Sequence, residues 1–481
     1  MSLLAPCLAH AEPWIAPGDE LLRTDLQLLA DRGIIRGPLT TWPLSWGDIA
    51  RDVGNAPMGD LSAAERTALA RVQARVQHEA QAQSLAAHVR LALAHDPRAL
   101  RTFEDTPRED AEVEAGVSWT GLRFSYRLQV AAVADPDDGQ DVRADGSYVG
   151  AAFGNWMFAA GAMQRWWGPG WDGSLILSNN ARPIPAISVN RNNTDPFAVP
   201  VLRLLGPWSA SFVWGQLESD AAVPNALFFG ARLNFRPLPS LELGLSRTAQ
   251  WCGEGRPCDL GTFFDLLTGN DNSGGGGITA ANQPGNQLAG VDVRWSAAGH
   301  GLPFALYGQF IGEDEANGLP SRYIGQLGAE YWGEISRWGS YRAHVEYADT
   351  AAAFYESTPL FDYAYEHNIY KDGYRYRGRP IGDSLDNDGQ LTSLGVTLAE
   401  SNGRGWNALL QIGNLNRGGR PNNRNTVSKD PADLYSFDVG HQRALGPGRL
   451  DVSIGYQSVK NKRTQETEQE PRALVQWSRQ L

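Results

Sequence analysis

The chain has 481 residues, a formal net charge of −12 and a mean hydropathy of −0.36. The negative charge argues against a nucleic-acid partner, because phosphate binding requires a basic face. No stretch approaches the roughly 20 consecutive apolar residues of a membrane-spanning helix. A spanning β-strand needs only about 9–11 residues that are apolar at alternate positions, so this composition is compatible with a transmembrane barrel.

The first eleven residues have the character of the end of a secretory signal peptide. Ala9-His10-Ala11 fits the small-residue pattern of a cleavage site. The apolar run before it is short and has no basic start. We therefore expect residues 1–11 to be the end of a signal peptide whose true start lies upstream.

Residues 12–83 have the pattern of a small helical domain that packs against something larger. A first helix is predicted from apolar residues at helical spacing and a glycine that ends the run: Leu22, Leu26, Leu29 and Gly33. A later helix is predicted from a capping box and the apolar face that follows it: Ser62, Glu65, Leu69, Val72 and Val76. Prolines and tryptophans between the two helices predict a packed connector: Pro38, Trp42, Pro43 and Trp46.

From residue 84 to residue 481, apolar residues recur with period two, which is typical of strands that are apolar on one face. The alternation is clearest at 112–119 and 122–130, and the run 85–94 supplies an earlier strand. One hairpin near 186–217 is weakly marked. Similar runs lie near 147–165, 208–217, 226–248, 288–311, 322–348, 390–413, 434–459 and 472–479.

The connections between these strands alternate between short turns and long loops rich in Asp, Asn and Gly. The long loops are expected near 134–146, 166–185, 249–287, 312–321, 349–389, 414–433 and 460–471. Outer-membrane barrels alternate in this way, with short periplasmic turns and long extracellular loops, whereas a soluble propeller has no reason to. We therefore predict an all-β transmembrane β-barrel of about 18 antiparallel strands over residues 84–481, with the helical domain 12–83 in the periplasm.

No pattern for catalysis, a cofactor or a metal site is present. Gly168 to Gly173 matches G-x-G-x-x-G, but no helix pattern follows it, as a dinucleotide site would need. The acidic run 313–315 is interpreted as a solvated loop tip rather than a catalytic pair. Residues 383–389 are interpreted as an Asx-rich turn, with a Ca²⁺ site as the less common alternative. We expect no enzyme, no cofactor and no metal.

Cys252 and Cys258 lie close together in one long, Gly-rich loop. A local disulfide in an oxidising compartment fits this spacing, and two free loop thiols are the alternative. They lack the second pair of ligands that a zinc site would require.

Two segments combine aromatic rings with arginine, asparagine and aspartate. Rings offer flat apolar platforms to sugars, and arginine can hold a carboxylate in a bidentate way. An aromatic girdle facing lipid, with arginines lining the lumen, is the alternative. In strand geometry the tyrosines of 374–376 would face one way and the arginines of 375–379 the other. The candidate polysaccharide-binding residues are Trp166, Trp167, Trp171, Asn179, Asn180, Arg182, Tyr363, Tyr365, Tyr370, Tyr374, Arg375, Tyr376, Arg377 and Arg379.

These segments, together with the opening run 26–33, resemble the Wzi-type capsule assembly family over nearly the whole chain. The resemblance rests on the tryptophan–asparagine run 165–183 and on the Tyr-Arg-Tyr-Arg-Gly-Arg stretch at 374–379. It implies an outer-membrane barrel of about 18 strands, a periplasmic helical bundle, and a non-enzymatic lectin role. The family pattern has a histidine where this chain has Asp383.

We therefore expect an outer-membrane lectin that binds exported capsular or extracellular polysaccharide and helps to anchor and assemble it at the cell surface. The alternative is an outer-membrane porin or sugar-selective channel, which shares every feature of the barrel. The expected partners are capsular polysaccharide or exopolysaccharide, outer-membrane lipid and lipopolysaccharide, and the polysaccharide export machinery. An outer-membrane enzyme acting on sugar or lipid is the least favoured of the three functions.

Overall fold

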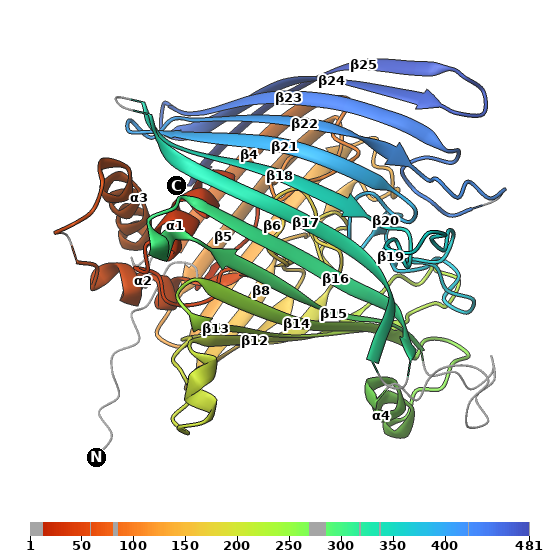
Figure 1. The fold of residues 1–481 in the computed structure, drawn as a ribbon, viewed down its shortest axis with the longest axis horizontal. Helices are drawn as coiled ribbons and strands as arrows, with labels where there is room; N and C mark the ends of the chain where they lie inside the picture. The colour runs from red at the N-terminus through yellow and green to blue at the C-terminus, as the bar shows by residue number, and fades with distance from the viewer. Residues whose placement is uncertain are drawn as a thin grey trace.

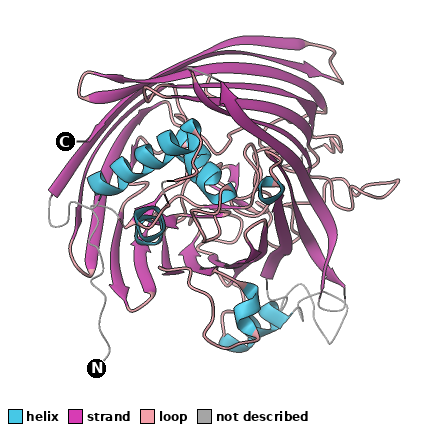
Figure 2. Cartoon of the chain, turned by 60° about the vertical axis from the view of Figure 1, so that its left-hand side comes forward, coloured by secondary structure: helices cyan, strands magenta, loops and turns pink. Residues whose placement is uncertain are grey.

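The computed structural model describes residues 13–57, 59–79, 85–268, 285–316, 319–335, 338–421 and 423–480. Within this part of the chain an antiparallel sheet closes on itself into a barrel (Figures 1 and 2). The closed sheet contains nineteen strands in these ranges. Two short ones, β7 (Val142–Arg143) and β8 (Tyr148–Phe153), both pair with β6 (Phe124–Ala134) and count as one interrupted strand. The barrel thus has 18 strands, as the sequence predicts.

Most barrel strands span 9 to 17 residues. The remaining strands, in chain order, are β4 (Leu85–His95), β5 (Ala111–Thr120), β9 (Trp156–Gly161), β11 (Ala186–Arg191), β12 (Trp208–Gln216), β13 (Leu227–Leu238), β14 (Leu241–Trp251), β15 (Gly285–Ser296), β16 (Phe304–Ala316), β17 (Leu319–Ile335), β18 (Gly339–Asp349), β21 (Gln390–Glu400), β22 (Gly405–Leu415), β23 (Ala432–Leu445), β24 (Gly448–Asn461) and β25 (Thr467–Gln480). The last strand, β25, pairs with β4 and closes the barrel.

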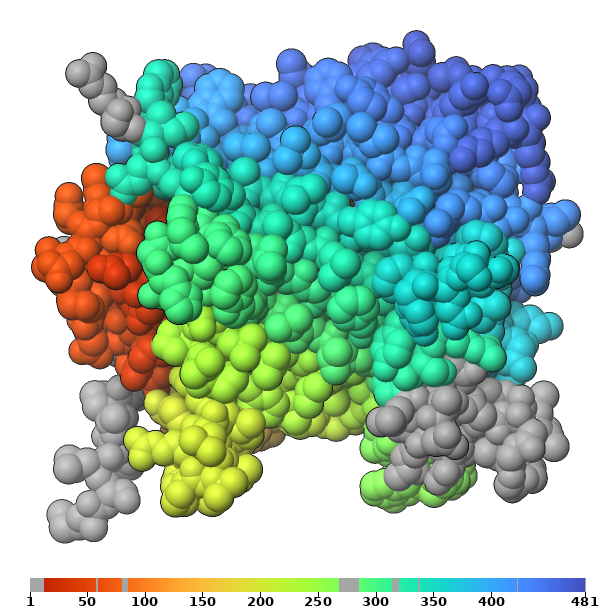
Figure 3. All heavy atoms as spheres, viewed as in Figure 1, coloured from red at the N-terminus to blue at the C-terminus, as the bar shows by residue number. Residues whose placement is uncertain are grey.

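Each barrel strand has one apolar face and one polar face, because successive side chains of a strand point to opposite sides. On β5 the outward Val113 is 54% exposed, whereas the inward Glu112 and Glu114 are buried. On β13 the inward Arg232 and Asn234 are buried in the same way. On the face seen in Figure 3, the outer wall forms a continuous surface between the two ends of the barrel. An apolar outer belt around a polar interior is the pattern of an outer-membrane barrel.

Three helices lie together at one end of the barrel, at the left of Figure 1. They are α1 (Glu20–Asp31), α2 (Trp46–Gly54) and α3 (Ala63–Glu79). The predicted capping box is present at α3, where the Glu65 amide donates to Ser62 Oγ at 3.2 Å and the Ser62 amide donates to Glu65 Oε2 at 2.7 Å. No helix in the described ranges is long and apolar enough to cross a membrane.

The structure corrects the sequence prediction at several connections. Trp46, predicted in a connector, begins α2, because Ser45 caps the helix by accepting from the Asp48 amide at 3.3 Å. The predicted loops 312–321 and 460–471 are mostly strand, since β16, β17, β24 and β25 extend into them. The acidic run 313–315 is therefore part of β16 rather than a loop tip.

Two further differences concern the ends of the barrel. The connection 192–207 is long although it lies at the helical end, where short turns are the rule, and it carries the short helix η1 (Leu202–Leu205). It packs on α2, where Asp48 accepts from Thr194 Oγ1 at 2.7 Å. The signal-peptide segment 1–11 and the predicted domain boundary at 83/84 lie outside the described residues.

The interior of the barrel is filled from both ends. From the helical end, the segment that follows α1 enters the lumen, and β2 (Thr41–Trp42) pairs there with β10 (Trp166–Trp167) of a long loop. Two more small sheets form away from the barrel wall: β1 (Trp14–Ile15) with β3 (Leu44–Ser45), and β19 (Arg375–Tyr376) with β20 (Arg379–Pro380). Figure 2 shows helices and loops inside the ring of strands.

The long loops gather at the opposite end, with β19 and β20 at the right of Figure 1. A fourth helix, α4 (Leu260–Thr268), lies outside the barrel at this end, and Leu266 packs on the outward Phe229 and Ala249. Cys252 and Cys258 are joined by a disulfide in the loop that leads to this helix. The last short helix, η2 (Ala298–His300), lies in a turn at the helical end.

Candidate functional site

The tryptophan–asparagine run, residues 165–183, lies inside the barrel and is called the plug segment below. Trp166 and Trp167 are fully buried, and Trp171 is 3% exposed. The Trp166 ring packs edge-on against Phe103 at 5.4 Å, and its Nε1 donates to the Gly170 carbonyl at 3.2 Å. These rings fill the core of the lumen. In this conformation no sugar can stack on them.

One carboxylate of the barrel wall holds the turn of the plug segment. Glu346 of β18 accepts hydrogen bonds from the backbone amides of Trp171, Asp172 and Gly173 at 2.9, 3.2 and 2.9 Å. Tyr307 of β16 donates its hydroxyl to the same carboxylate at 2.8 Å. The glycines of the G-x-G-x-x-G match are needed for this close approach: a Cβ on Gly173 would stand 2.2 Å from Asp383 Oδ2. The motif therefore shapes a turn on a carboxylate and not a phosphate site.

The asparagines and the arginine of the plug segment tie it to neighbouring loops. Asn179 donates to the Phe103 carbonyl and Asn180 to the Pro380 carbonyl, both at 3.0 Å. Arg182 pairs with Asp138 at 2.6 Å and with Asp145 at 2.8 Å. The two amides are thus used within the protein, whereas Arg182 is only partly buried.

The tyrosine–arginine stretch does not form the alternating strand that the sequence suggests. Only β19 and β20 pair, and Arg377 and Gly378 form the turn between them with φ of 51° and 75°, as a type I′ turn requires. Tyr374 is buried and donates to the Ile176 carbonyl at 2.7 Å. Arg375 is also buried and its Nε donates to Asp386 at 3.0 Å. Tyr374, Arg375 and Tyr376 are all buried. The tyrosines and the arginines of this stretch therefore do not lie on two opposite faces of a strand.

The fourteen candidate residues therefore divide into two groups. Ten are buried: Trp166, Trp167, Trp171, Asn179, Asn180, Tyr365, Tyr370, Tyr374, Arg375 and Tyr376. Four keep intermediate exposure at the long-loop end: Arg182, Tyr363, Arg377 and Arg379. Arg379 pairs with the exposed Asp137 at 3.2 Å, and the Arg322 guanidinium lies 4.8 Å from the Tyr363 ring centre. The buried group supports the loops that carry the accessible group.

Asp383, where the family pattern has histidine, is buried among these loops. Its Oδ1 accepts from the Leu385 amide at 3.0 Å, which is an Asx turn, and its Oδ2 has no hydrogen-bond partner in the described part of the chain. Burial raises the pKa of Asp383 to about 6, with the Leu385 amide opposing the rise and the Asp172 carboxylate adding to it. No group of three or more His, Cys, Asp or Glu that could hold a metal is found among the described residues.

We expect Asp383→Asn to stabilise the protein at neutral pH. The pKa of Asp383 in the folded state lies above its ordinary value, so its ionised form lowers the free energy of unfolding. This penalty is complete above pH 6 and disappears as the pH falls toward 4. The gain should reach roughly 3 kcal/mol near pH 8, at about 1.4 kcal/mol per pKa unit. Denaturant midpoints in detergent between pH 4 and pH 8 measure it. Asp386→Asn is the control and should destabilise, because Asp386 pairs with Arg375; a pH-independent gain for Asp383→Asn would contradict this account.

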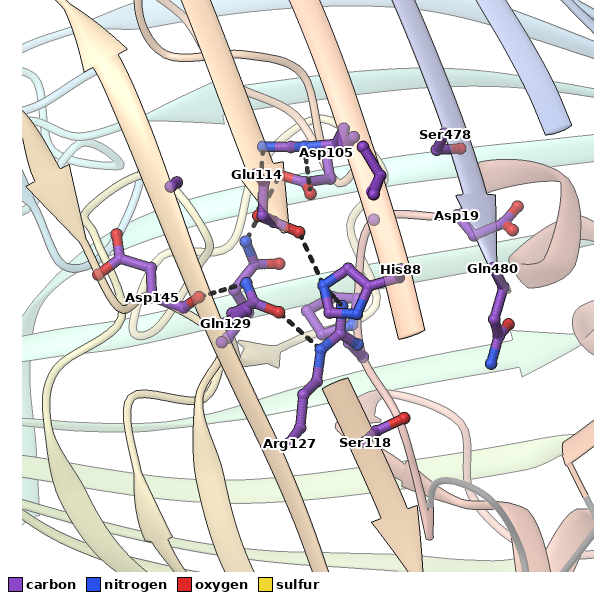
Figure 4. Close-up of a pocket in the computed structure, with 18 of the residues that line it drawn as sticks. Asp19, His88, Asp105, Glu114, Ser118, Arg127, Gln129, Asp145, Ser478 and Gln480 are labelled. Carbon is purple, nitrogen blue, oxygen red and sulfur yellow. Dashed lines mark hydrogen bonds and ion pairs between the residues drawn. The ribbon is translucent and has the colours of Figure 1, made fainter. Parts of the chain in front are cut away.

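A cavity of about 540 Å³ lies inside the barrel between the N-terminal segment and the wall formed by β4, β5, β6 and β25. Figure 4 shows polar side chains from these elements around it. His88 pairs with Glu114 at 3.2 Å, and Arg127 donates to Gln129 at 2.6 Å. Asp105 of the β4–β5 loop lies near Glu114 in Figure 4 and pairs with Arg90 at 3.2 Å.

Two carboxylates at the edge of this cavity are held ionised. Burial alone would raise the pKa of Asp105, but Arg90 and Arg101 outweigh it and the pKa falls below its ordinary value. The pKa of Asp19 is also below its ordinary value. Burial raises this pKa, but Arg449 at 3.1 Å and Arg75 lower it by more. The cavity thus presents charges of both signs, already paired.

The sequence reasoning missed the residues of this cavity. The available signal was the unusual chemistry of the inward face, since charged or amide side chains occupy alternate positions at Glu112, Glu114, Arg127 and Gln129. Alternation predicted that they face inward. It did not predict which stretch of the wall the plug segment leaves uncovered.

Comparisons with known proteins agree with this architecture. The family model of capsule assembly protein Wzi matches residues 74–474. An uncharacterized 55.8 kDa protein in the cps region of Klebsiella pneumoniae is 35% identical over 454 residues, which is 92% of this chain and 85% of that protein. The solved structure of Wzi, an outer membrane protein involved in group 1 capsule assembly in Escherichia coli and a carbohydrate-binding β-barrel, superposes with a TM-score of 0.84 at 30% identity, over 97% of this chain and 99% of that one. The chain is an outer-membrane β-barrel that belongs to the Wzi family of capsule assembly proteins.

Proposed function

We propose that this protein is a non-enzymatic outer-membrane lectin that binds exported capsular or extracellular polysaccharide and helps to hold and assemble it at the cell surface. The observation that carries the proposal is the likeness to Escherichia coli Wzi, a carbohydrate-binding barrel, over nearly the full length of both chains. The match of the capsule assembly family to most of the chain supports it.

The orientation follows from the asymmetry of the connections. Outer-membrane barrels place short turns in the periplasm and long loops outside. In this orientation the helical domain, residues 12–83, lies in the periplasm, the barrel occupies residues 84–481, and the long loops face the capsule. Lipid and lipopolysaccharide would contact the outer belt, and the export machinery would meet the helical end.

The packed lumen supports a lectin rather than a diffusion channel. Trp42 and Trp166 from opposite ends of the barrel meet in one core cluster. A second cluster joins Trp167 of the plug segment to Tyr365 and Tyr374 of another long loop. A diffusion porin needs a water-filled path through the lumen, whereas both of these clusters are buried inside it.

Polysaccharide binding is proposed at the long-loop end, on Arg182, Tyr363, Arg377 and Arg379 and the loops beside them. Guanidinium groups can bond sugar hydroxyls and hold uronic carboxylates in a bidentate way. The buried candidates act through these four by fixing the loops that present them.

The test is the double variant Arg377→Ala/Arg379→Ala. Loss of two charge-assisted contacts, each worth about 1.5–3 kcal/mol, should weaken binding of an acidic polysaccharide at least tenfold. Binding by the wild-type protein should also weaken as salt rises. Whole-cell polysaccharide assays and binding to purified protein measure both effects.

Two matched variants control for folding. Arg404→Ala removes an exposed arginine from a turn at the opposite end and should leave binding unchanged. Arg375→Ala breaks a buried pair with Asp386 and should lower stability by about 3–5 kcal/mol instead. Wild-type retention of polysaccharide by a correctly folded double variant would exclude this surface as the binding site.

A further inference from the structure

We propose that the internal cavity is a second glycan site, which takes a short, hydroxyl-rich oligosaccharide segment from the helical end of the barrel. The inference rests on the proposed polysaccharide-binding function and adds a site at the opposite end from the surface loops. Along β5 the lining extends from Glu112, near the long-loop end of the strand, to Ser118, near its helical end.

The cavity opens at the helical end. Its lining there includes Arg75 and His78 of α3 and Pro447 of the β23–β24 turn, all exposed residues. Ser478 and Gln480, on the inner face of β25, continue this edge and remain partly exposed (Figure 4). In the proposed orientation this opening faces the periplasm.

The long-loop end of the cavity is closed by a chain of ion pairs. Arg143 pairs with Glu109 and, at 3.1 Å, with Asp138. Arg182 of the plug segment joins the same Asp138 at 2.6 Å and Asp145 at 2.8 Å. These five side chains connect three separate loops, so a ligand that entered from outside would have to break a network of ion pairs.

The lining suits a sugar more than an apolar or strongly charged ligand. Side chains of Asp19, Asp105 and Arg449 keep between 24% and 36% exposure although they lie within the lumen, so their polar atoms are available to a guest. Carboxylates accept hydrogen bonds from sugar hydroxyls, and guanidinium groups donate hydrogen bonds to sugar hydroxyls. Because cations and anions are already paired, a ligand with a large net charge gains little. Trp14 and Met163 also line the cavity but are buried, so the exposed lining is mainly polar.

The size limits the guest to a few sugar units. A volume of about 540 Å³ falls within the range of roughly 300–1,000 Å³ that is usual for small-ligand sites. A polymer chain cannot pass through, because the plug segment packs there against the segment after α1 and against the loop that carries Tyr365 and Tyr374. The site would therefore hold a chain end or a short fragment that arrives from the periplasmic side.

The experiment compares two substitutions of neighbouring alanines on β6. Ala131 faces the cavity and is buried, whereas Ala132 faces outward and is exposed. Ala131→Trp places a large ring in part of the cavity, and Ala132→Trp adds the same ring to the lipid face. The probes are oligosaccharides of one and two repeat units, prepared from the host's capsular polysaccharide, titrated into purified full-length protein in detergent. Ala131→Trp should lower their affinity at least tenfold, and Ala132→Trp should not change it.

A second measurement uses Ala131→Cys, a small change that keeps the barrel intact. A membrane-impermeant maleimide should label it only in cells whose periplasm is open to the reagent, and the one-repeat oligosaccharide should protect it. Ala131→Cys is made in a Cys7→Ser background, and the Cys7→Ser protein, whose remaining Cys252 and Cys258 are joined, is the blank. Labelling from outside intact cells, no protection, or equal oligosaccharide binding by Ala131→Trp would overturn the cavity site. If the wild-type protein bound neither polymer nor fragment, the proposed lectin function would fail instead.

Discussion

Asp31→Asn is expected to loosen the helical domain from the barrel. Asp31 is the last residue of α1, and its carboxylate accepts from Arg294 Nη1 at 2.7 Å and from Arg342 Nη2 at 3.0 Å. Glu330 of β17 pairs with the same two arginines, at 2.9 Å for Arg294 Nε. All four side chains are buried, so two positive charges face two negative ones inside the lumen.

Removal of one carboxylate leaves an uncompensated buried positive charge. Breaking a buried pair from one side costs about 3–5 kcal/mol, because the remaining charge stays without water. We expect this cost to appear first as detachment of α1, because the barrel keeps its backbone pairing without Asp31. Limited proteolysis should then cut the helical domain at a protease concentration that leaves the wild-type protein intact.

Asp60→Asn is the control, since Asp60 is an exposed aspartate of the same domain. It should match the wild type in proteolysis and in the temperature at which the folded band shifts on gels. If Asp31→Asn kept wild-type protease resistance, the four-residue network would not be what docks the domain.

The barrel was predictable because its rule is local. Alternation of apolar and polar residues depends only on strand geometry and on the two environments of the wall. It therefore gave the strand from 85 onward, the hairpin at 112–130 and the total of 18. The capping box at Ser62 and Glu65 is equally local. Errors arose where strands continue past the expected loop, as at 312–321, because polar strand ends beyond the lipid belt lose the alternation of a half-apolar strand.

The placement of the candidate residues was not predictable in the same way. Trp166, Tyr374 and Arg375 occur in loops, and a loop in a barrel can fold outward into solvent or inward into the lumen. Their composition fits both cases, since tyrosine and arginine serve a buried network as well as a sugar. The partners in the folded chain decide: Arg375 pairs with the buried Asp386, and Tyr374 bonds to the distant Ile176 carbonyl and Thr248.

The residues that hold the plug segment are even harder to identify from the sequence than the candidate residues. Glu346 is one of many inward polar residues of β18, and nothing in its neighbourhood in the sequence sets it apart from Arg342 or His344. Its role depends on a contact with the Gly173 amide, which lies 173 positions away in the sequence. Physical reasoning from the sequence predicts an inward carboxylate there. It does not predict which of the loops that carboxylate binds.

Glu346→Ala is expected to have the largest effect on the lumen. The substitution leaves the amides of Trp171, Asp172 and Gly173 buried without their acceptor. Each unmade bond of this kind costs about 1–3 kcal/mol, so together they rival the stability of an ordinary domain. The hydroxyl of Tyr307 loses its acceptor as well. We therefore expect the plug segment to leave its place while the 18 strands remain paired.

The readout is ion conductance in planar bilayers, in which the wild-type barrel should stay closed and Glu346→Ala should show open-channel steps. Glu346→Gln keeps one carbonyl acceptor and should lie between the two, because its amide group repels the donors that the second oxygen served. Val345→Ala, one residue away on the lipid face and 45% exposed, should behave as the wild type. A closed Glu346→Ala barrel with normal gel mobility would show that other contacts of the plug segment, such as Arg182 with Asp138 and Asp145, suffice to keep it in the lumen. Open steps would instead identify one carboxylate as what separates this closed barrel from a channel.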